Sequence, residues 1–255
     1  YKYFLYTCII NAVVGGLLLL YGRGAENKMS RRDGYCVVTL SWVFFTFFGM
    51  LPFYFSGSID TITNAFFETM SGFTTTGATI LDDIESLSHG MLFWRSLTQW
   101  IGGLGIVFFT IAILPIFTTG GVQLFSAETT GVTHDRTHPK INVMAKWLWT
   151  IYLILTVSET ILLMFGGMDL FDAICQSFAT TATGGYSTKQ NSISYWNSPY
   201  IEYVVAIFMI ISSINFSLFL MCLKGKVSRL FKDEETHWFL ASVGILTLLI
   251  TLALV

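Results

Sequence analysis

The sequence predicts an all-α integral membrane protein built from repeated units, each consisting of a helix, a re-entrant loop and a second helix. Three observations lead to this fold class. Long apolar runs recur along the chain, basic residues gather in alternate connections between the runs, and two other connections each hold a short helical pattern followed by a threonine- and glycine-rich segment. Composition agrees, because 12% of the 255 residues are charged, against roughly 25% in soluble domains.

Six apolar runs have about the ~20 residues that a helix needs to cross a ~30 Å hydrocarbon core. They cover residues 3–21, 34–56, 90–115, 145–168, 198–222 and 238–255. The first run has no small-residue cleavage site and is therefore not expected to be a signal peptide. Since the chain starts at Tyr1 and stops inside an apolar run at Val255, we expect both ends to be cut from a longer protein.

The basic residues predict the orientation of these spans. They form three clusters: Arg23, Lys28, Arg31 and Arg32; Arg136, Lys140 and Lys146; and Lys224, Lys226, Arg229 and Lys232. Such clusters mark cytoplasmic segments. Residues 57–89 contain no Lys or Arg and residues 166–199 contain only Lys189, so both should face outside. Lys2 and Arg95 depart from this pattern, and we expect them to lie at the membrane interface by snorkelling.

The first outer connection contains a predicted half-helix over residues 60–73. Asp60 or Thr61 can cap its start, and its apolar residues follow helical spacing. The segment Thr74-Thr75-Thr76-Gly77-Ala78-Thr79 comes directly after it.

The second outer connection repeats this plan. Asp169 precedes a predicted half-helix from residue 170 to about 180, and Thr181-Ala182-Thr183-Gly184-Gly185-Tyr186-Ser187-Thr188 follows. We align Gly77 with Gly184, which requires a slip of one residue farther upstream. Internal repeats of this kind build many membrane transport folds.

These two segments have the chemistry of a cation filter. Unwound backbone at membrane depth is tolerated only where it is buried in protein or lines a water-filled path. There it can direct successive carbonyl oxygens at a dehydrated cation. Glycine permits backbone angles that a β-carbon forbids, and the carbonyl end of each half-helix carries a partial charge of roughly −0.5 that favours a cation. The sequence therefore predicts re-entrant units around a potassium-channel-like pore.

In these stretches the chain closely resembles the Trk/Ktr/HKT superfamily of potassium transporters, in particular the TrkH type. The resemblance rests on residues 64–79, 171–174 and 177–188, and extends to Gln99-Trp100-Ile101-Gly102-Gly103-Leu104-Gly105-Ile106 and Ala112-Ile113-Leu114-Pro115. It implies four units around one pore, each contributing a filter strand with a key glycine, here Gly77 and Gly184. Glycine at this position is associated with potassium passage, and serine in the first unit with sodium preference.

The expected filter residues follow from these motifs. They are Thr74, Thr75, Thr76, Gly77, Ala78, Thr181, Ala182, Thr183, Gly184 and Gly185. Potassium contacts are expected at Thr75, Thr76 and Thr183, and the contribution of position 182 is left open. No catalytic residue and no cofactor are expected; potassium is the transported substrate.

The units are predicted with the following boundaries. Residues 1–33 form an N-terminal span and cytoplasmic link, 34–117 the first pore unit, 118–145 a cytoplasmic connector, 146–223 the second pore unit, and 224–255 a link and the start of a third unit. Two units make half a filter, which cannot enclose an ion, so the rest must come from a further segment or another polypeptide. The resemblance also implies a homodimer in membrane lipid and a cytoplasmic ring of nucleotide-binding regulatory subunits.

The function expected from this sequence is potassium uptake across the cytoplasmic membrane. Two alternatives remain, a sodium-permeable transporter of the same family and a non-conducting assembly or regulatory subunit. Nucleic-acid binding is excluded, because the net charge is −2 and no basic patch is interleaved with aromatic residues. An intramembrane enzyme would need a nucleophile beside a base, and no His lies within a span next to Ser, Cys or a carboxylate.

A few other residues have competing interpretations. Glu159 lies inside the fourth predicted span, where an ionisable group indicates either a functional role, or packing against a polar partner or a protonated carboxyl within the bundle. His134 and His138 lack a third ligand at suitable spacing, so a solvated loop is favoured over a metal site. The glycines at 102, 103 and 105 are expected to allow close helix packing.

Overall fold

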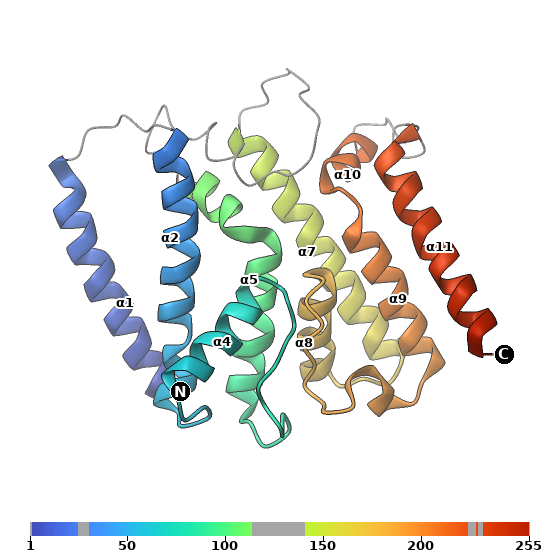
Figure 1. The fold of residues 1–255 in the computed structure, drawn as a ribbon, viewed down its shortest axis with the longest axis horizontal. Coiled ribbons are helices and arrows are strands. Elements are labelled where there is room, and N and C mark those ends of the chain that lie inside the picture. Colours follow the sequence, from blue (N-terminus) through green and yellow to red (C-terminus); the bar gives the residue numbers. More distant parts are fainter. Residues whose placement is uncertain (1, 25–30, 114–140, 224–227, 229–231, 255) are drawn as a thin grey trace.

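The computed structural model describes residues 2–24, 31–113, 141–223, 228 and 232–254, and every regular element in this part of the chain is helical. The elements in chain order are α1 (Lys2–Tyr21), η1 (Gly22–Gly24), α2 (Arg31–Gly49), α3 (Leu51–Phe55), α4 (Ile62–Phe73), α5 (His89–Ile113), α7 (Ile141–Phe165), α8 (Leu170–Thr181), η3 (Ser192–Trp196), α9 (Pro199–Ser213), α10 (Phe216–Leu223) and α11 (Glu234–Leu254). The long helices stand side by side (Figure 1). The all-α fold class is confirmed.

Membrane-length helices occur where the sequence predicts spans. Among the described residues, three helices are long and apolar enough to cross a membrane, over Lys2–Gly24, Lys146–Phe165 and Glu234–Leu254. Two shorter apolar helices cover Thr39–Phe55 and Pro199–Ser213. With α5, they account for all six predicted spans.

Two of the spans are interrupted where the backbone leaves the α-helical path, and a third is divided without leaving it. Met50, between α2 and α3, keeps right-handed helical angles (φ −77°, ψ −19°), and Pro52 lies in the first turn of α3, where a missing N–H is tolerated. Ile214 has an extended conformation (φ −76°, ψ 144°) and ends α9. Gly105 has φ 67° and ψ 160° inside α5, a region that residues with a β-carbon rarely adopt.

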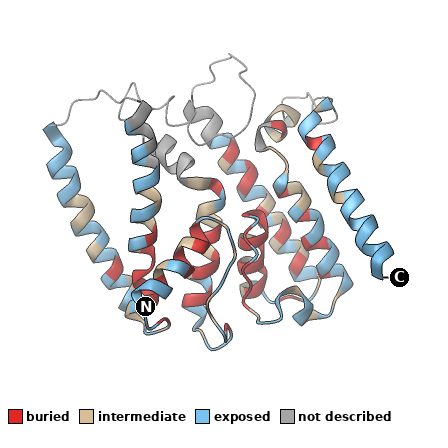
Figure 2. Cartoon of the chain, viewed as in Figure 1, coloured by how far each residue is buried: buried red, intermediate tan, exposed pale blue. Residues whose placement is uncertain are grey.

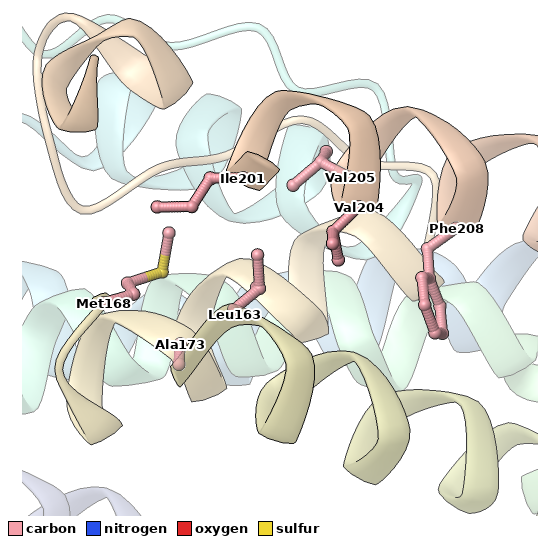
Figure 3. Close-up of a cluster of buried hydrophobic side chains, with 7 residues drawn as sticks. All are labelled: Leu163, Met168, Ala173, Ile201, Val204, Val205 and Phe208. Atoms are coloured by element: carbon pink, nitrogen blue, oxygen red, sulfur yellow. The ribbon is translucent and has the colours of Figure 1, made fainter. Parts of the chain in front are cut away.

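Each predicted pore unit has its own apolar core. The first core contains Met50, Phe53, Ile59, Ala65 and Met91. The second contains Leu163, Met168, Ala173, Ile201, Val204, Val205 and Phe208, contributed by α7, α8, α9 and the segment after α7 (Figure 3). Ala65 and Ala173 are both fully buried, so a small side chain lets each half-helix approach its neighbours closely.

The two half-helices, α4 and α8, lie toward the same end of the molecule (Figure 1). α4 packs against α2 and α5, whereas α8 packs against α5, α7 and α9. α5 therefore contacts both half-helices and joins the two units. The C-terminal ends of α1 and α5 and the N-terminal ends of α2, α7 and α11 lie at the opposite end, as the alternating charge pattern predicts.

The first and last helices lie at the periphery. Thr7 is the buried residue of α1 and Thr236 that of α11, and the rest of both helices is at least partly exposed (Figure 2). An apolar helix with so little protein packed on it needs lipid or further protein to cover it. The predicted connector over residues 118–145 falls outside the described residues up to residue 140, and with it His134 and His138.

Candidate ion-binding site

Two capped half-helices position the re-entrant loops. α4 and α8 have 12 residues each, which at 1.5 Å per residue gives about 18 Å, too short to cross a ~30 Å core. The Thr61 hydroxyl accepts a hydrogen bond from the Asn64 N–H, and the Asp169 carboxylate accepts one from the Phe171 N–H, both at 3.2 Å. Both predicted half-helices are confirmed, with Thr61 rather than Asp60 as the first cap.

The loops that follow are equivalent at a constant separation of 108 residues. The Thr76 N–H donates to the Ser71 carbonyl at 2.9 Å, and the Gly184 N–H donates to the Ala179 carbonyl at 2.8 Å. This register differs from the sequence alignment, which paired Gly77 with Gly184. The alignment was wrong because it matched glycines by type, whereas the helix ends set the spacing.

Backbone angles give the same register. The angle φ is +54° at Thr75 and +76° at Gly77, and +55° at Thr183 and +84° at Gly185. Gly77 therefore corresponds to Gly185, while Gly184 occupies the position of a threonine. Because the sign of φ alternates along each loop, successive carbonyl oxygens turn toward the same side, the arrangement that carbonyl filters use.

Two of these positions are strained. Thr75 and Thr183 are β-branched residues with positive φ, a conformation that is a genuine outlier for this residue type. Such residues cost about 1–3 kcal/mol each and persist where the surrounding structure holds them, often at functional sites. The strain occurs at the same place in both units.

The two loops meet. A β-carbon added to Gly77 would overlap the carbonyl oxygen of Gly184. One added to Gly184 would overlap the carboxamide of Gln99 on α5. The two loops, 108 residues apart in sequence, are therefore in direct contact at Gly77 and Gly184.

Three residues of the expected filter lie before the unwound backbone. Thr74 is the C-cap of α4, Thr181 is the last residue of α8, and Ala182 is its C-cap. The unwound segments begin one residue after each cap, at Thr75 and Thr183.

Ala78, also expected in the filter, turns its carbonyl oxygen toward the protein. That oxygen accepts hydrogen bonds from the Ser71 hydroxyl at 2.6 Å and from the Tyr186 hydroxyl at 3.3 Å. It is therefore engaged, and the run of first-loop carbonyls that accept no hydrogen bond from the described residues ends at Gly77.

Arg95 is buried between the loops, so its predicted place at the membrane interface was wrong. Its side chain is 2% exposed and its Nε donates to Glu68 Oε1 at 2.7 Å. Its Nη1 donates to the Ser187 carbonyl at 2.9 Å, and the guanidinium lies 3.6 Å from the centroid of the Tyr186 ring. A desolvated Arg needs such partners, because an unpaired charge in a low-dielectric interior is costly.

Glu68 connects this charge to the first loop. One of its carboxylate oxygens accepts from the Thr79 hydroxyl and the other from the Ile80 N–H, both at 3.0 Å. Its backbone carbonyl accepts from the Tyr186 hydroxyl at 2.8 Å.

Sequence reasoning missed Glu68, Arg95 and Tyr186 as members of the site. A signal was present, because Glu68 lies in an apolar half-helix and Arg95 in an apolar span, and opposite charges at membrane depth are expected to pair. The role of Tyr186 depended on the tertiary contacts.

The outer segments of the two units are also linked. Gln190 Oε1 accepts from the Ile84 N–H at 3.1 Å, and the Gln190 N–H donates to Glu85 Oε1 at 3.3 Å. Within the second unit, Lys189 lies 3.6 Å from Asp172, whose other oxygen accepts from the Thr188 hydroxyl at 2.7 Å.

Glu159 packs against the end of the second half-helix. It is fully buried, and its Oε2 accepts from the Thr181 hydroxyl at 3.4 Å. The polar partner that the second interpretation required is therefore present, and Oε1 has no hydrogen-bond partner in the described structure.

Gly102 and Gly103 of α5 allow the close packing that the sequence predicts, whereas Gly105 breaks the helix. A β-carbon on Gly102 would overlap the Phe73 carbonyl at the end of α4, and one on Gly103 would come within 2.7 Å of Ala182. Among the residues that the structure describes, no group of three or more His, Cys, Asp or Glu side chains is placed to hold a metal ion.

Comparison with known proteins gives one consistent result. The family model TrkH, described as cation transport protein, matches residues 2–255. The Trk system potassium uptake protein TrkH of Escherichia coli K12 is 43% identical over 254 residues, which is 98% of this chain and 53% of that protein. The Halomonas elongata TrkH protein is 39% identical over 244 residues, 93% of this chain and 51% of the relative.

A solved structure agrees. The crystal structure of the potassium transporter TrkH from Vibrio parahaemolyticus superimposes with a TM-score of 0.79 at 33% identity, covering 94% of this chain and 49% of that one. The chain therefore spans about half the length of the relatives that it matches.

Proposed function

The chain belongs to the TrkH cation transport family and is a multi-pass membrane protein, and on that premise we propose that it supplies two units of a four-unit pore for potassium uptake across the cytoplasmic membrane. The family is one of cation transport proteins, so no covalent chemistry is proposed. Selection is made by backbone carbonyl oxygens, and potassium is the transported substrate rather than a bound cofactor.

One observation carries this proposal. Two unwound segments with alternating φ meet where a β-carbon on Gly77 would overlap the Gly184 carbonyl. Each follows the C-terminal end of a half-helix, where the partial negative charge of roughly −0.5 stabilises a cation.

We assign the ion-contacting carbonyls by the structural register. Thr75 and Thr76 in the first loop correspond to Thr183 and Gly184 in the second, and Gly77 corresponds to Gly185. Position 182, which the sequence left open, is a helix cap and is excluded from the contacts. Thr74, Thr181 and Ala78 support the loops without binding the ion.

Because the chain covers about half of its relatives, the other two units must complete the ring. We propose that they come from a further segment of the same polypeptide, and that the complete protein forms a homodimer in the membrane. The cytoplasmic ends of the helices are the surface where a ring of nucleotide-binding regulatory subunits would dock.

The glycines also separate potassium from sodium transport. We propose a potassium-selective pathway because Gly77 stands where sodium-preferring members have serine. The sodium-permeable alternative and the non-conducting alternative make different predictions in a single experiment.

The intact gene that encodes this chain is expressed in a bacterial strain that lacks its own potassium uptake systems. Growth at low potassium and saturable uptake of rubidium tracer are expected, with sodium competing weakly. Equal competition by sodium would favour the sodium-permeable alternative, and no uptake from protein present in the membrane would favour the non-conducting one. In the Gly77→Ser variant, sodium should compete more strongly with rubidium uptake, since serine adds a side chain at the contact between the loops.

A further inference from the structure

Four buried side chains connect the two loops and have no part in ion contact as assigned above. Glu68, Arg95, Gln99 and Tyr186 are each at most 2% exposed. We refer to them as the cross-unit network. Glu68, Arg95 and Gln99 belong to the first unit, and Tyr186 belongs to the second.

Gln99 determines the direction of one filter carbonyl. Its Oε1 accepts a hydrogen bond from the Tyr186 N–H at 3.1 Å. That N–H shares a planar peptide with the Gly185 carbonyl, and in a trans peptide the two groups point in opposite directions. Since Gln99 is fully buried and Gly185 is exposed, the Gly185 carbonyl points away from the protein interior.

Tyr186 links its loop to the first one. Its hydroxyl donates to the Glu68 carbonyl at 2.8 Å and to the Ala78 carbonyl at 3.3 Å. Ala78 directly follows Gly77, the last residue of the first filter segment, and Tyr186 directly follows Gly185, the last residue of the second. The hydrogen bond from Tyr186 to Ala78 therefore joins the ends of the two segments.

Arg95 joins the other members of the network through its positive charge. It binds the carboxylate of Glu68, the Ser187 carbonyl and the face of the Tyr186 ring. Glu68 in turn accepts from Thr79 and Ile80 of the first loop. A rotation of either loop would leave a buried charge or a buried carbonyl without its partner, which is costly.

We propose that the cross-unit network positions the two filter loops relative to each other, and that Tyr186 and Gln99 thereby determine the preference for potassium over sodium. This inference rests on the proposed function. A carbonyl ring selects between cations through the number and placement of its oxygens, and the network sets that placement for the last carbonyl of each segment. These four are positioning residues, because none of them contacts the ion.

The test compares Tyr186→Phe with Trp94→Phe in the full-length transporter. Both changes keep an aromatic body and remove a donor to backbone carbonyl groups, since the Trp94 indole N–H donates to the Gly49 carbonyl at 2.9 Å. Trp94 is the neighbour of Arg95 on α5 but contacts the first core instead. For each variant, the concentration of sodium that halves tracer uptake is measured together with the thermal unfolding midpoint.

The Tyr186→Phe variant is expected to lower the preference for potassium over sodium roughly fivefold, which is the effect of one hydrogen bond on an equilibrium constant. The Trp94→Phe variant should leave that ratio unchanged at a similar loss of thermal stability. Equal ratios in wild type and Tyr186→Phe, with only stability lost, would show that the network is structural and overturn the inference.

A second measurement does not depend on transport. Hydrogen exchange in peptides that cover residues 183–190 reports the Tyr186 amide, which Gln99 protects. Gln99→Met is expected to raise exchange there, and unchanged exchange overturns the positioning role. If wild type takes up no cation while this exchange difference is present, the proposed function fails and the coupling of the loops stands.

Discussion

At the residue scale, the glycines of this chain differ in what a side chain would meet. Gly57 and Gly77 have nearly the same backbone, with φ of +67° and +76°. A β-carbon on Gly57 would meet nothing within 4 Å, whereas on Gly77 it would overlap the Gly184 carbonyl. Conformation alone therefore does not distinguish a glycine at the contact between the loops from a glycine in an open turn.

The first prediction uses this pair. Gly57→Ala and Gly77→Ala both incur the cost of a left-handed residue, about 1–2 kcal/mol. Only Gly77→Ala also displaces the second loop, so potassium uptake by the intact transporter should fall by roughly tenfold or more, as expected for a further ~1–3 kcal/mol of steric strain. Tracer uptake, normalised to the amount of protein in the membrane, measures this. Normal uptake by Gly77→Ala would rule out a tight contact between the loops.

The second prediction concerns the buried ion pair. Glu68→Gln or Arg95→Gln leaves the other charge buried without its counter-ion, and each should cost roughly 3–5 kcal/mol of stability. The double variant should cost less than the sum of the two, because no charge is left behind. Thermal unfolding of the purified transporter in detergent gives all three values.

The matched control for this comparison of single and double variants is the outer ion pair of Lys189 and Asp172, whose side chains are 23% and 10% exposed. Lys189→Gln should cost at most about 1 kcal/mol, since solvent screens partly exposed pairs. Additive effects of the two inner substitutions would contradict direct coupling between Glu68 and Arg95.

At the element scale, α5 joins the two units. It carries Arg95 and Gln99 toward the loops, and its glycines face the ends of both half-helices. Gly105 then breaks the helix. The glycines of α5 thus pack against the C-terminal ends of α4 and α8. The partial negative charges of these two helix ends face the candidate ion site.

The third prediction compares glycines within helices. Gly103→Ala should destabilise the protein, because its β-carbon would come within 2.7 Å of both Ala182 and the Tyr152 hydroxyl. Gly16→Ala in α1 meets nothing within 4 Å and should be neutral or stabilise by about 0.5–1 kcal/mol, the usual helix preference for alanine. Unfolding midpoints measure both, and a stabilising Gly103→Ala would mean that α8 lies farther from α5 than the structure places it.

At the scale of the whole molecule, both loops and both outer connections lie at one end, and the helix ends next to the basic clusters lie at the other (Figure 1). The outer connections are held together through Gln190. The peripheral helices α1 and α11 leave apolar surface open to lipid or to the rest of the transporter.

The fourth prediction tests this orientation. In a variant with Cys8, Cys36, Cys175 and Cys222 replaced by serine, Asp83→Cys and Asn191→Cys should react with a membrane-impermeant thiol reagent added outside intact cells. Arg23→Cys should react only after the membrane is opened, because basic segments stay in the cytoplasm. Labelling is read by mass shift, and the reverse pattern would invert the proposed topology.

Much of the fold follows from local sequence properties. Apolar length gave the spans, and the half-helices began at their predicted capping residues because caps and periodicity depend on neighbours in the chain. The identity of the family also followed from motifs. The register of the two loops did not follow from the sequence. Gly77 and Gly184 were aligned because each follows a threonine, whereas counting from the ends of α4 and α8 makes Gly77 equivalent to Gly185.

The sequence by itself determined that this protein has membrane helices and two copies of a half-helix followed by an irregular loop, and that it belongs to a family of cation transport proteins. Only the tertiary structure decided that Arg95 lies between the loops rather than at the interface, that Ala78 turns its carbonyl inward, and that Tyr186 joins the two units. The reason is physical. Helix formation and membrane insertion depend on short stretches of chain, whereas the partner of a buried charge or carbonyl depends on which distant segments pack together.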